Sequence, residues 1–188
     1  MRWVARAGWR RWTGCAGFLL ALVAFPAAGR AASLADKLAV LPPQAAIEAP
    51  DFEVRTPDGG SLRLRDFRGQ VVFLTFWATW CVPCRREMPA MEKLYREFRD
   101  QGFTIVALDL NEPIAAVRAF VKELGLTFPV GIDPAMVNFA VYGGRALPTS
   151  YLIGRDGLIL GIVIGPREWD SEDARRYIES LLAKPRRP

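Results

Sequence analysis

The chain has 188 residues, 51% of them hydrophobic, which is enough for one domain with a well-packed core and short extensions. Its formal net charge of +5 does not indicate nucleic-acid binding, because five arginines fall in residues 1–30 and the rest of the chain carries 20 basic and 20 acidic residues. The three cysteines and the absence of histidine leave too few ligands for an ordinary zinc site.

Residues 1–31 are predicted to be a secretory signal peptide or an N-terminal membrane anchor. A basic stretch, Arg2–Arg11, precedes an apolar run, Cys15–Ala28, and the small residues Gly29 and Ala31 follow at the spacing of a cleavage site. As a helix this 14-residue run would span about 21 Å, short of a hydrocarbon core of about 30 Å, which favours a cleaved signal. In either case we expect a periplasmic or otherwise exported protein.

Residues 32–48 are predicted to form a linker, because a short helix after Ser33 would be stopped by Pro42 and Pro43. Residues 49–188 are predicted to form the domain. They begin with two alternating segments around a glycine-containing turn, which predict an antiparallel β-hairpin at 51–54 and 61–64.

Strand and helix patterns then alternate along the chain. Apolar runs predict strands at 71–77, 103–108 and 128–132, followed by a hairpin with arms at 151–153 and 158–163. Periodic apolar positions with start and stop signals predict helices at 82–99, 113–124, 133–142 and 170–182. This order predicts an α/β fold in which helices cover a central sheet.

The chemistry of the chain is concentrated in a C-x-x-C motif at the junction of the strand 71–77 and the helix 82–99. Cys81 and Cys84 are spaced so that they can cycle between dithiol and disulfide. Cys81 precedes the helix, where free N–H groups and the helix dipole favour a thiolate, so we expect it to be the attacking sulfur. Cys84, one turn into the helix, is expected to resolve the mixed disulfide.

Two other roles for this motif are less favoured. Half of a zinc site would need two further ligands, and the sequence offers neither a histidine nor a second cysteine pair. A structural disulfide that closes so short a loop would constrain little of the unfolded chain.

Three segments in this order resemble the TlpA/ResA-like, AhpC/TSA-related thioredoxin-fold proteins. Residues 76–89, which read FWATWCVPCRREMP, resemble the active-site segment of that family, residues 49–52 its N-terminal addition, and residues 147–157 the segment with the cis-proline. The resemblance implies a thioredoxin-like fold, with a central mixed sheet flanked by helices and an added N-terminal β-hairpin. It also implies an exported thiol–disulfide oxidoreductase, usually a reductant, that often serves cytochrome c maturation.

The same resemblance implies a set of site residues. Pro148 is expected to be cis and to lie beside the cysteines, which would leave the Leu147 backbone free to pair with a substrate peptide. The residues expected to contact the substrate are Trp80, Val82, Pro83, Leu147 and Pro148. No cofactor or metal is expected beyond the redox-active pair Cys81–Cys84.

The proton acceptor for Cys84 is not evident from the sequence. Thioredoxin has a buried acid six positions before its first cysteine, with a lysine partner; here Thr75 and Ala107 correspond to those residues. Some family members have a glutamate between the cysteines, where this chain has Val82. Glu87 is a candidate, although a carboxylate on a helix surface is more often solvated.

Two other functions remain open. A peroxiredoxin-like peroxidase would have a proline and a threonine before its reactive cysteine, where this chain has Leu74 and Ala78. A copper-delivering dithiol would lack its usual histidine ligand. As partners we expect protein thiol or disulfide substrates, a membrane-bound electron donor and no nucleic acid, for a monomeric protein. The direction of electron flow, reductase or oxidase, is not fixed by these residues.

Overall fold

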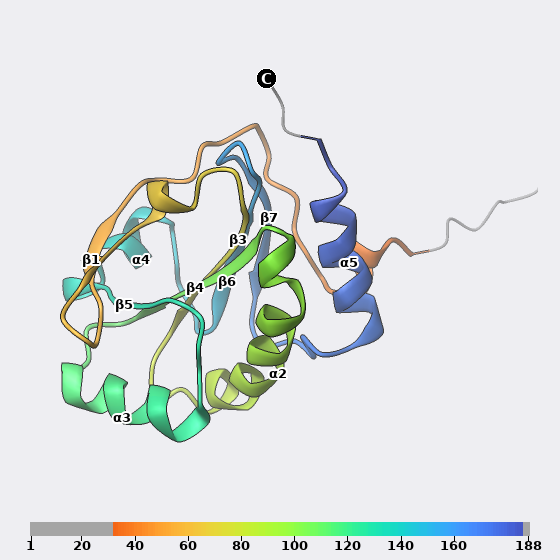
Figure 1. Ribbon diagram of the computed structural model, residues 1–188. Coiled ribbons are helices and arrows are strands. Elements are labelled where there is room, and N and C mark those ends of the chain that lie inside the picture. The colour runs from red at the N-terminus through yellow and green to blue at the C-terminus, as the bar shows by residue number, and fades with distance from the viewer. Residues whose placement is uncertain (1–31, 186–188) are drawn as a thin grey trace, which may run out of the picture. The chain divides into compact units, whose positions relative to one another are not determined.

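The computed structural model describes residues 32–185, and the signal peptide or anchor predicted for residues 1–31 lies outside them. Within the described residues seven strands form one mixed sheet in the order β2-β1-β5-β4-β3-β6-β7 (Figure 1). The strands are β1 Glu53–Arg55, β2 Ser61–Arg63, β3 Val71–Trp77, β4 Phe103–Asp109, β5 Val130–Ile132, β6 Thr149–Ile153 and β7 Ile159–Ile164. Strands β3, β4 and β5 are parallel, and the other neighbours pair antiparallel.

The central strand β3 has every residue buried, so both of its faces pack against other parts of the domain. Side chains alternate along a strand, and here Phe73 and Trp77 join one apolar core while Leu74 and Phe76 join a second. The continuous apolar run from Val71 is therefore that of a strand covered on both sides.

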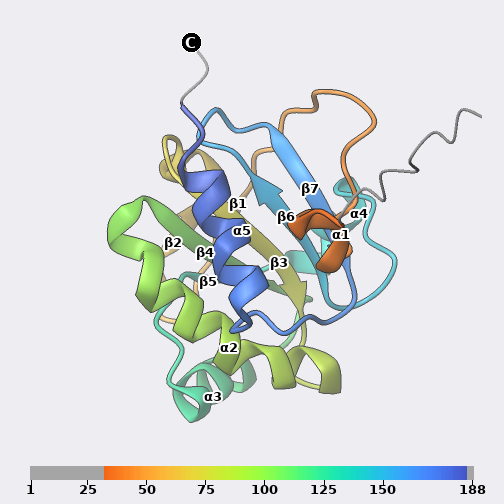
Figure 2. The same ribbon diagram turned by 90° about the vertical axis from the view of Figure 1, so that its right-hand side faces the viewer.

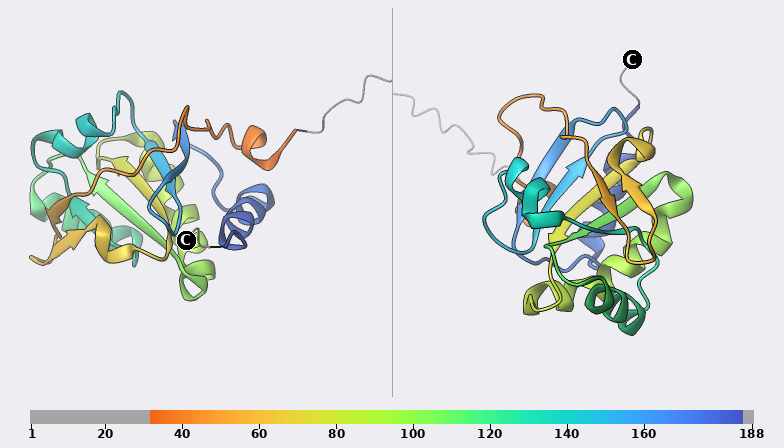
Figure 3. Two further views of the ribbon diagram at one scale, coloured as in Figure 1. Left: turned by 90° about the horizontal axis from the view of Figure 1, so that it is seen from above. Right: turned by 90° about the vertical axis from the view of Figure 1, so that its left-hand side faces the viewer.

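Three helices contribute to the first core: α2 Val82–Phe98, α3 Ile114–Leu124 and α5 Glu172–Leu182. Figure 2 shows α2 and α5 lying across the sheet on the same side. The second core lies beneath α4 Val137–Val141 and the segment that forms the N-terminal hairpin (Figure 3). The thioredoxin-like α/β architecture with its added hairpin, expected from the sequence, is confirmed.

Residues 32–48, for which we expected a linker, are packed against the domain. Helix α1, Leu34–Lys37, is capped by Ser33, and the Lys37 ammonium pairs with Asp173 of α5 at 2.8 Å. Leu38 and Val40 are buried in the first core, and two isolated bridges join positions 41 and 48 to positions 162 and 158. The apolar side chains of this segment explain its attachment, since their burial is favourable.

The helix expected at 133–142 is broken in two. A 3-10 turn, Pro134–Met136, precedes α4, and Ala135 and Met136 have positive φ angles of 51° and 58°. The cause is Asp133, whose buried carboxylate accepts the backbone N–H groups of Asn138 and Phe139. The prediction of one continuous helix was therefore wrong, because the acid caps a helix that starts four residues later.

Helix α2 runs unbroken through Pro89, and its position next to the site makes it the principal scaffold of the catalytic motif. Of the helices in residues 32–185, none has the length and apolar character required to cross a membrane.

Candidate active site

The site begins where β3 ends. The loop Ala78–Trp80 connects β3 to α2, and Cys81 is the N-cap of α2. Its sulfur accepts the backbone N–H of Cys84 at 3.3 Å, so the cysteine caps the helix in the way that a serine or aspartate usually does. The N–H groups and dipole at this helix end favour negative charge on the same sulfur.

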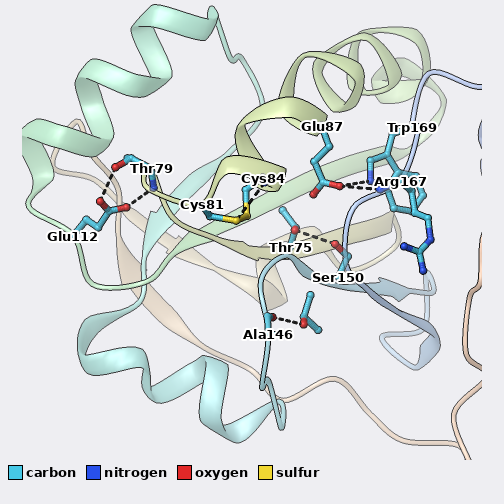
Figure 4. The surroundings of a disulfide bond; sticks show 11 residues. Thr75, Thr79, Cys81, Cys84, Glu87, Glu112, Ala146, Ser150, Arg167 and Trp169 are labelled. Atoms are coloured by element: carbon cyan, nitrogen blue, oxygen red, sulfur yellow. Dashed lines mark hydrogen bonds between the residues drawn. A yellow bond between two sulfur atoms is a disulfide. The ribbon is translucent and has the colours of Figure 1, made fainter.

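The two cysteines form a disulfide with a Cα–Cα distance of 5.3 Å. Cys81 keeps 3% of its surface exposed, whereas Cys84 has none. This small difference makes Cys81 the cysteine of the pair that a partner can approach more readily and leaves Cys84 for the internal step. Figure 4 shows the disulfide at the start of α2.

The peptide bond between Leu147 and Pro148 is cis, as expected. Strands β3 and β6 pair with Phe76 opposite Thr149, so Pro148 lies at the level of the end of β3, where the cysteine loop begins. Pro148 is buried and Leu147 half-buried. The structure therefore brings the cis-proline segment to the same end of the sheet as Cys81.

The residues expected to contact a substrate surround Cys81 in two different ways. Trp80 and Val82 are 68% and 53% exposed, although both are large and apolar. Pro83 is half-buried and lines a cleft of about 700 Å³ together with Glu87 and Arg167. Exposed apolar side chains on the two residues that flank a reactive cysteine in the chain are suited to contact a partner protein.

Glu87 is buried, contrary to our expectation that it would be solvated. It is 4% exposed and accepts the Arg167 backbone N–H and the Trp169 indole N–H, each at 3.2 Å (Figure 4). Its other oxygen, Oε1, has no hydrogen-bond partner among the described residues. Burial raises the pKa of the Glu87 carboxyl to about 7, against the two hydrogen bonds and the charge of Arg167, which lower it.

The burial of Glu87 depends on residues about eighty positions later in the chain. Its spacing from Cys84, three residues along α2, places both side chains on one face of the helix. That face is covered by Trp169, whose ring packs edge-on against Phe73 at 4.6 Å. The helical spacing could have marked Glu87 from the sequence, but its cover could not.

No acid lies at the position beneath the cysteines that thioredoxin fills with one. Thr75 is fully buried there, and its hydroxyl accepts a hydrogen bond from Ser150 Oγ at 2.9 Å. Ala107 stands opposite Thr75 in the β3–β4 register, as the sequence comparison with thioredoxin suggested. Glu87 is thus the carboxyl group that shares a face of α2 with Cys84.

A second acidic group adjoins the loop on the side of α3, and no pattern in the sequence indicated it. Glu112 accepts hydrogen bonds from the backbone N–H and the hydroxyl of Thr79, and its own N–H donates to Asp109 (Figure 4).

The comparisons with known proteins agree with this geometry. The model of the AhpC/TSA family matches residues 46–162. The chain is 42% identical over 137 residues to the thiol-disulfide oxidoreductase ResA of Bacillus thuringiensis (strain Al Hakam), covering 73% of this chain and 76% of the relative. It is also 42% identical over 133 residues to the protein of the same name from Geobacillus thermodenitrificans, covering 71% and 75% of the two chains.

Among solved structures, the chain is similar to a thiol:disulfide interchange protein of the thioredoxin family from Chlorobium tepidum TLS. The TM-score is 0.67 at 31% identity, and the match covers 75% of this chain and 99% of the other.

The raised pKa of Glu87 predicts that this residue lowers the unfolding free energy of the protein as pH rises. A carboxyl group with a pKa of about 7 in the folded chain and an ordinary one of 4.5 when unfolded contributes stability at low pH that is lost as pH rises through 7. Glutamine cannot ionise, so Glu87→Gln does not share this loss. We expect the unfolding free energy of the variant minus that of the parent to increase by about 3 kcal/mol from pH 4 to pH 8. Urea unfolding of both oxidised proteins at several pH values measures this gain, and a constant difference across the range contradicts it.

Proposed function

The chain belongs to the AhpC/TSA family and is a ResA-like thiol-disulfide oxidoreductase, and from this premise we propose that it is an exported dithiol reductant of disulfides in partner proteins. The observation that carries the proposal is the disulfide at the amino end of α2, in which Cys81 retains a small exposed surface between the exposed neighbours Trp80 and Val82 and Cys84 retains none. The resemblance to TlpA/ResA-like proteins points to cytochrome c maturation as the process that it serves.

In the proposed reaction the reduced chain supplies two electrons. The Cys81 thiolate attacks one sulfur of the substrate disulfide, a mixed disulfide forms, and the other substrate sulfur leaves as a thiolate. The Cys84 thiolate then attacks the Cys81 sulfur and expels the second substrate thiolate. The substrate is reduced to a dithiol, and Cys81–Cys84 is oxidised to the disulfide state of this structure.

Cys84 must lose a proton before it attacks, and we propose Glu87 as the acceptor. Three features support this role: its place on the same face of α2 as Cys84, its unpartnered Oε1, and a pKa raised by burial to about 7. A base with a pKa near the working pH is partly ionised and still basic enough to take a proton. The cleft that Glu87 lines with Pro83 and Arg167 gives that proton a route to solvent.

The substrate surface is proposed to combine side-chain and backbone contacts. Trp80 and Val82 offer apolar area on either side of Cys81. The backbone of Leu147, next to the cis-proline, is positioned at the level of the cysteine loop and would pair with an extended peptide. Such contacts are largely independent of sequence, which suits a reductant that acts on a segment around a disulfide.

The export signal predicted for residues 1–31 supports a location outside the cytosol, where a dithiol must be recharged by another protein. We propose that a membrane-bound dithiol supplies the electrons and that the chain acts as a monomer.

Serine variants test the order of attack. We expect Cys81→Ser to abolish reduction of a protein disulfide, because no thiolate remains at the attacking position. We expect Cys84→Ser to accumulate a mixed disulfide, because the resolving sulfur is missing. Non-reducing electrophoresis of each reduced variant, incubated with disulfide-bonded insulin as substrate, separates these outcomes.

A different outcome would favour a different enzyme. If Cys84→Ser forms no mixed disulfide with any protein of a periplasmic extract, while the parent chain consumes hydrogen peroxide, the peroxidase reaction replaces the one proposed.

The reduction potential tests the direction of electron flow. We expect the Cys81–Cys84 couple to lie well below about −200 mV, as a reductant requires. Equilibration with glutathione and dithiothreitol buffers, followed by alkylation and mass analysis, measures it. A value near about −120 mV would identify an oxidant instead.

Kinetics of the second step test Glu87. We expect Glu87→Gln to slow resolution of the mixed disulfide by about 10²-fold at pH 7, the contribution typical of a general base. Stopped-flow measurement of a preformed mixed disulfide isolates this step. Glu168→Gln is the matched control, because Glu168 lines the same cleft but is exposed, and its rate should equal that of the parent. Equal slowing in both variants contradicts the role of Glu87.

A further inference from the structure

We infer that Glu112 and Asp109 are positioning residues that hold the loop before Cys81 in place, and that the loop is released when both carboxyl groups are ionised. The inference rests on the proposed function, because it concerns the reactivity of the sulfur that the function assigns to attack. It concerns the side of the loop that faces α3, away from Glu87.

Glu112 clamps the loop through two hydrogen bonds to one residue. Its carboxylate accepts the Thr79 backbone N–H at 2.5 Å and the Thr79 hydroxyl at 2.6 Å. The next turn of the loop is closed by the Cys81 N–H, which donates to the carbonyl of Ala78 at 3.1 Å. Two residues before the attacking sulfur, the backbone is thus fixed from a different segment of the chain.

Glu112 is held in turn by Asp109, the last residue of β4. Asp109 Oδ1 accepts the Glu112 backbone N–H at 2.8 Å. Asp109 has no exposed surface, and its Oδ2 has no hydrogen-bond partner among the described residues. A buried acid of this kind is expected to keep its proton.

The charges around the pair support this assignment. Burial raises the pKa of Asp109 to about 8, and the adjacent Glu112 carboxylate adds to the increase. Burial also works against ionisation of Glu112, but Asp109 and the Thr79 donors outweigh it and lower the pKa of Glu112. At neutral pH, therefore, Glu112 carries the negative charge and Asp109 carries the proton.

Other ionisable groups near the pair are engaged elsewhere. On β5, the side next to Asp109, the carboxylate of Asp133 caps α4. On α2, Arg85 pairs with Glu123 at 2.9 Å and lies over the ring of Phe120. On α3, Arg118 donates to the carbonyl of Pro57. None of these interactions supplies a positive charge to a second ionised carboxylate at Asp109.

Ionisation of Asp109 therefore places two negative charges in contact beneath the loop. Their repulsion is expected to displace Glu112 from Thr79, and the added charge disfavours the Cys81 thiolate. Above pH 8 the reactivity of Cys81 should then be lower than the reactivity expected for a single thiol that titrates independently.

The test compares the alkylation of Cys81 by iodoacetamide in the reduced full chain between pH 6 and pH 9.5. We expect the thiolate-to-thiol ratio of Cys81, read from the parent rate, to fall about fivefold below a one-thiol titration curve above pH 8, the effect of one nearby unit charge. Asp109→Asn should follow the one-thiol curve, because its amide oxygen can still accept the Glu112 backbone N–H and the side chain has no proton to lose. Glu123→Gln, which removes an exposed carboxylate from α3, should retain the parent shape.

A measurement on the unaltered chain covers the case in which the Asn variant does not fold. The amide proton shift of Thr79, followed by NMR, should change with a midpoint near pH 8. Superimposed alkylation curves for parent and Asp109→Asn, or a Thr79 amide that does not titrate, overturn the inference and leave the proposed function intact. Failure of the parent chain to react with iodoacetamide and to reduce insulin at any pH contradicts the proposed function itself.

Discussion

The site depends on one structural constraint: a fully buried strand delivers the chain, through the short loop Ala78–Trp80, to the amino end of a helix. Strand β3 is fixed by packing on both faces, so the position where it ends is fixed too. The first residue available to cap α2 is then a cysteine, and its sulfur takes the N–H of Cys84 that the helix leaves unpaired. The capping interaction and the redox chemistry use the same atom, because the N–H groups and dipole of the helix end favour negative charge on this sulfur once the disulfide is reduced.

Two buried acids lie on opposite sides of this sulfur pair, and desolvation gives each a different protonation behaviour. Glu87 lies on the helix itself, with two donors that partly offset its burial. Asp109 lies at the end of the neighbouring parallel strand and is further disfavoured from ionising by an adjacent carboxylate. One acid is thus suited to exchange a proton near neutral pH, and the other to keep one. The position of the single buried acid of thioredoxin is filled here by Thr75, whose hydroxyl accepts a hydrogen bond from Ser150.

Most of the fold could be predicted from local patterns, because each helix or strand has its own periodicity of apolar residues and its own start and stop residues. The run from Val71 predicted a buried strand, and Gly125, in the left-handed region at φ 61°, ended α3 as expected. The cis peptide bond before Pro148 followed from the family resemblance and was confirmed. Two predictions were wrong. Glu87 is buried because Trp169, from a distant segment, covers it. The helix predicted to begin at Asp133 begins four residues later, because the Asp133 carboxylate caps it. The clamp of Glu112 on Thr79 spans 33 residues and had no local signal at all.

The attachment of residues 38–48 along β7 also affects how the molecule behaves in a crowded compartment. β7 is the last strand of the sheet, and an open edge strand is a template for pairing with another chain. Here the N–H and C=O groups of Ile162 are already bonded to Leu41, and a further bridge lies at Leu158. At the opposite end, β2 has only three residues, with charged side chains around it. The two edges of the sheet therefore present little free backbone to other extended chains, which limits aggregation through edge pairing.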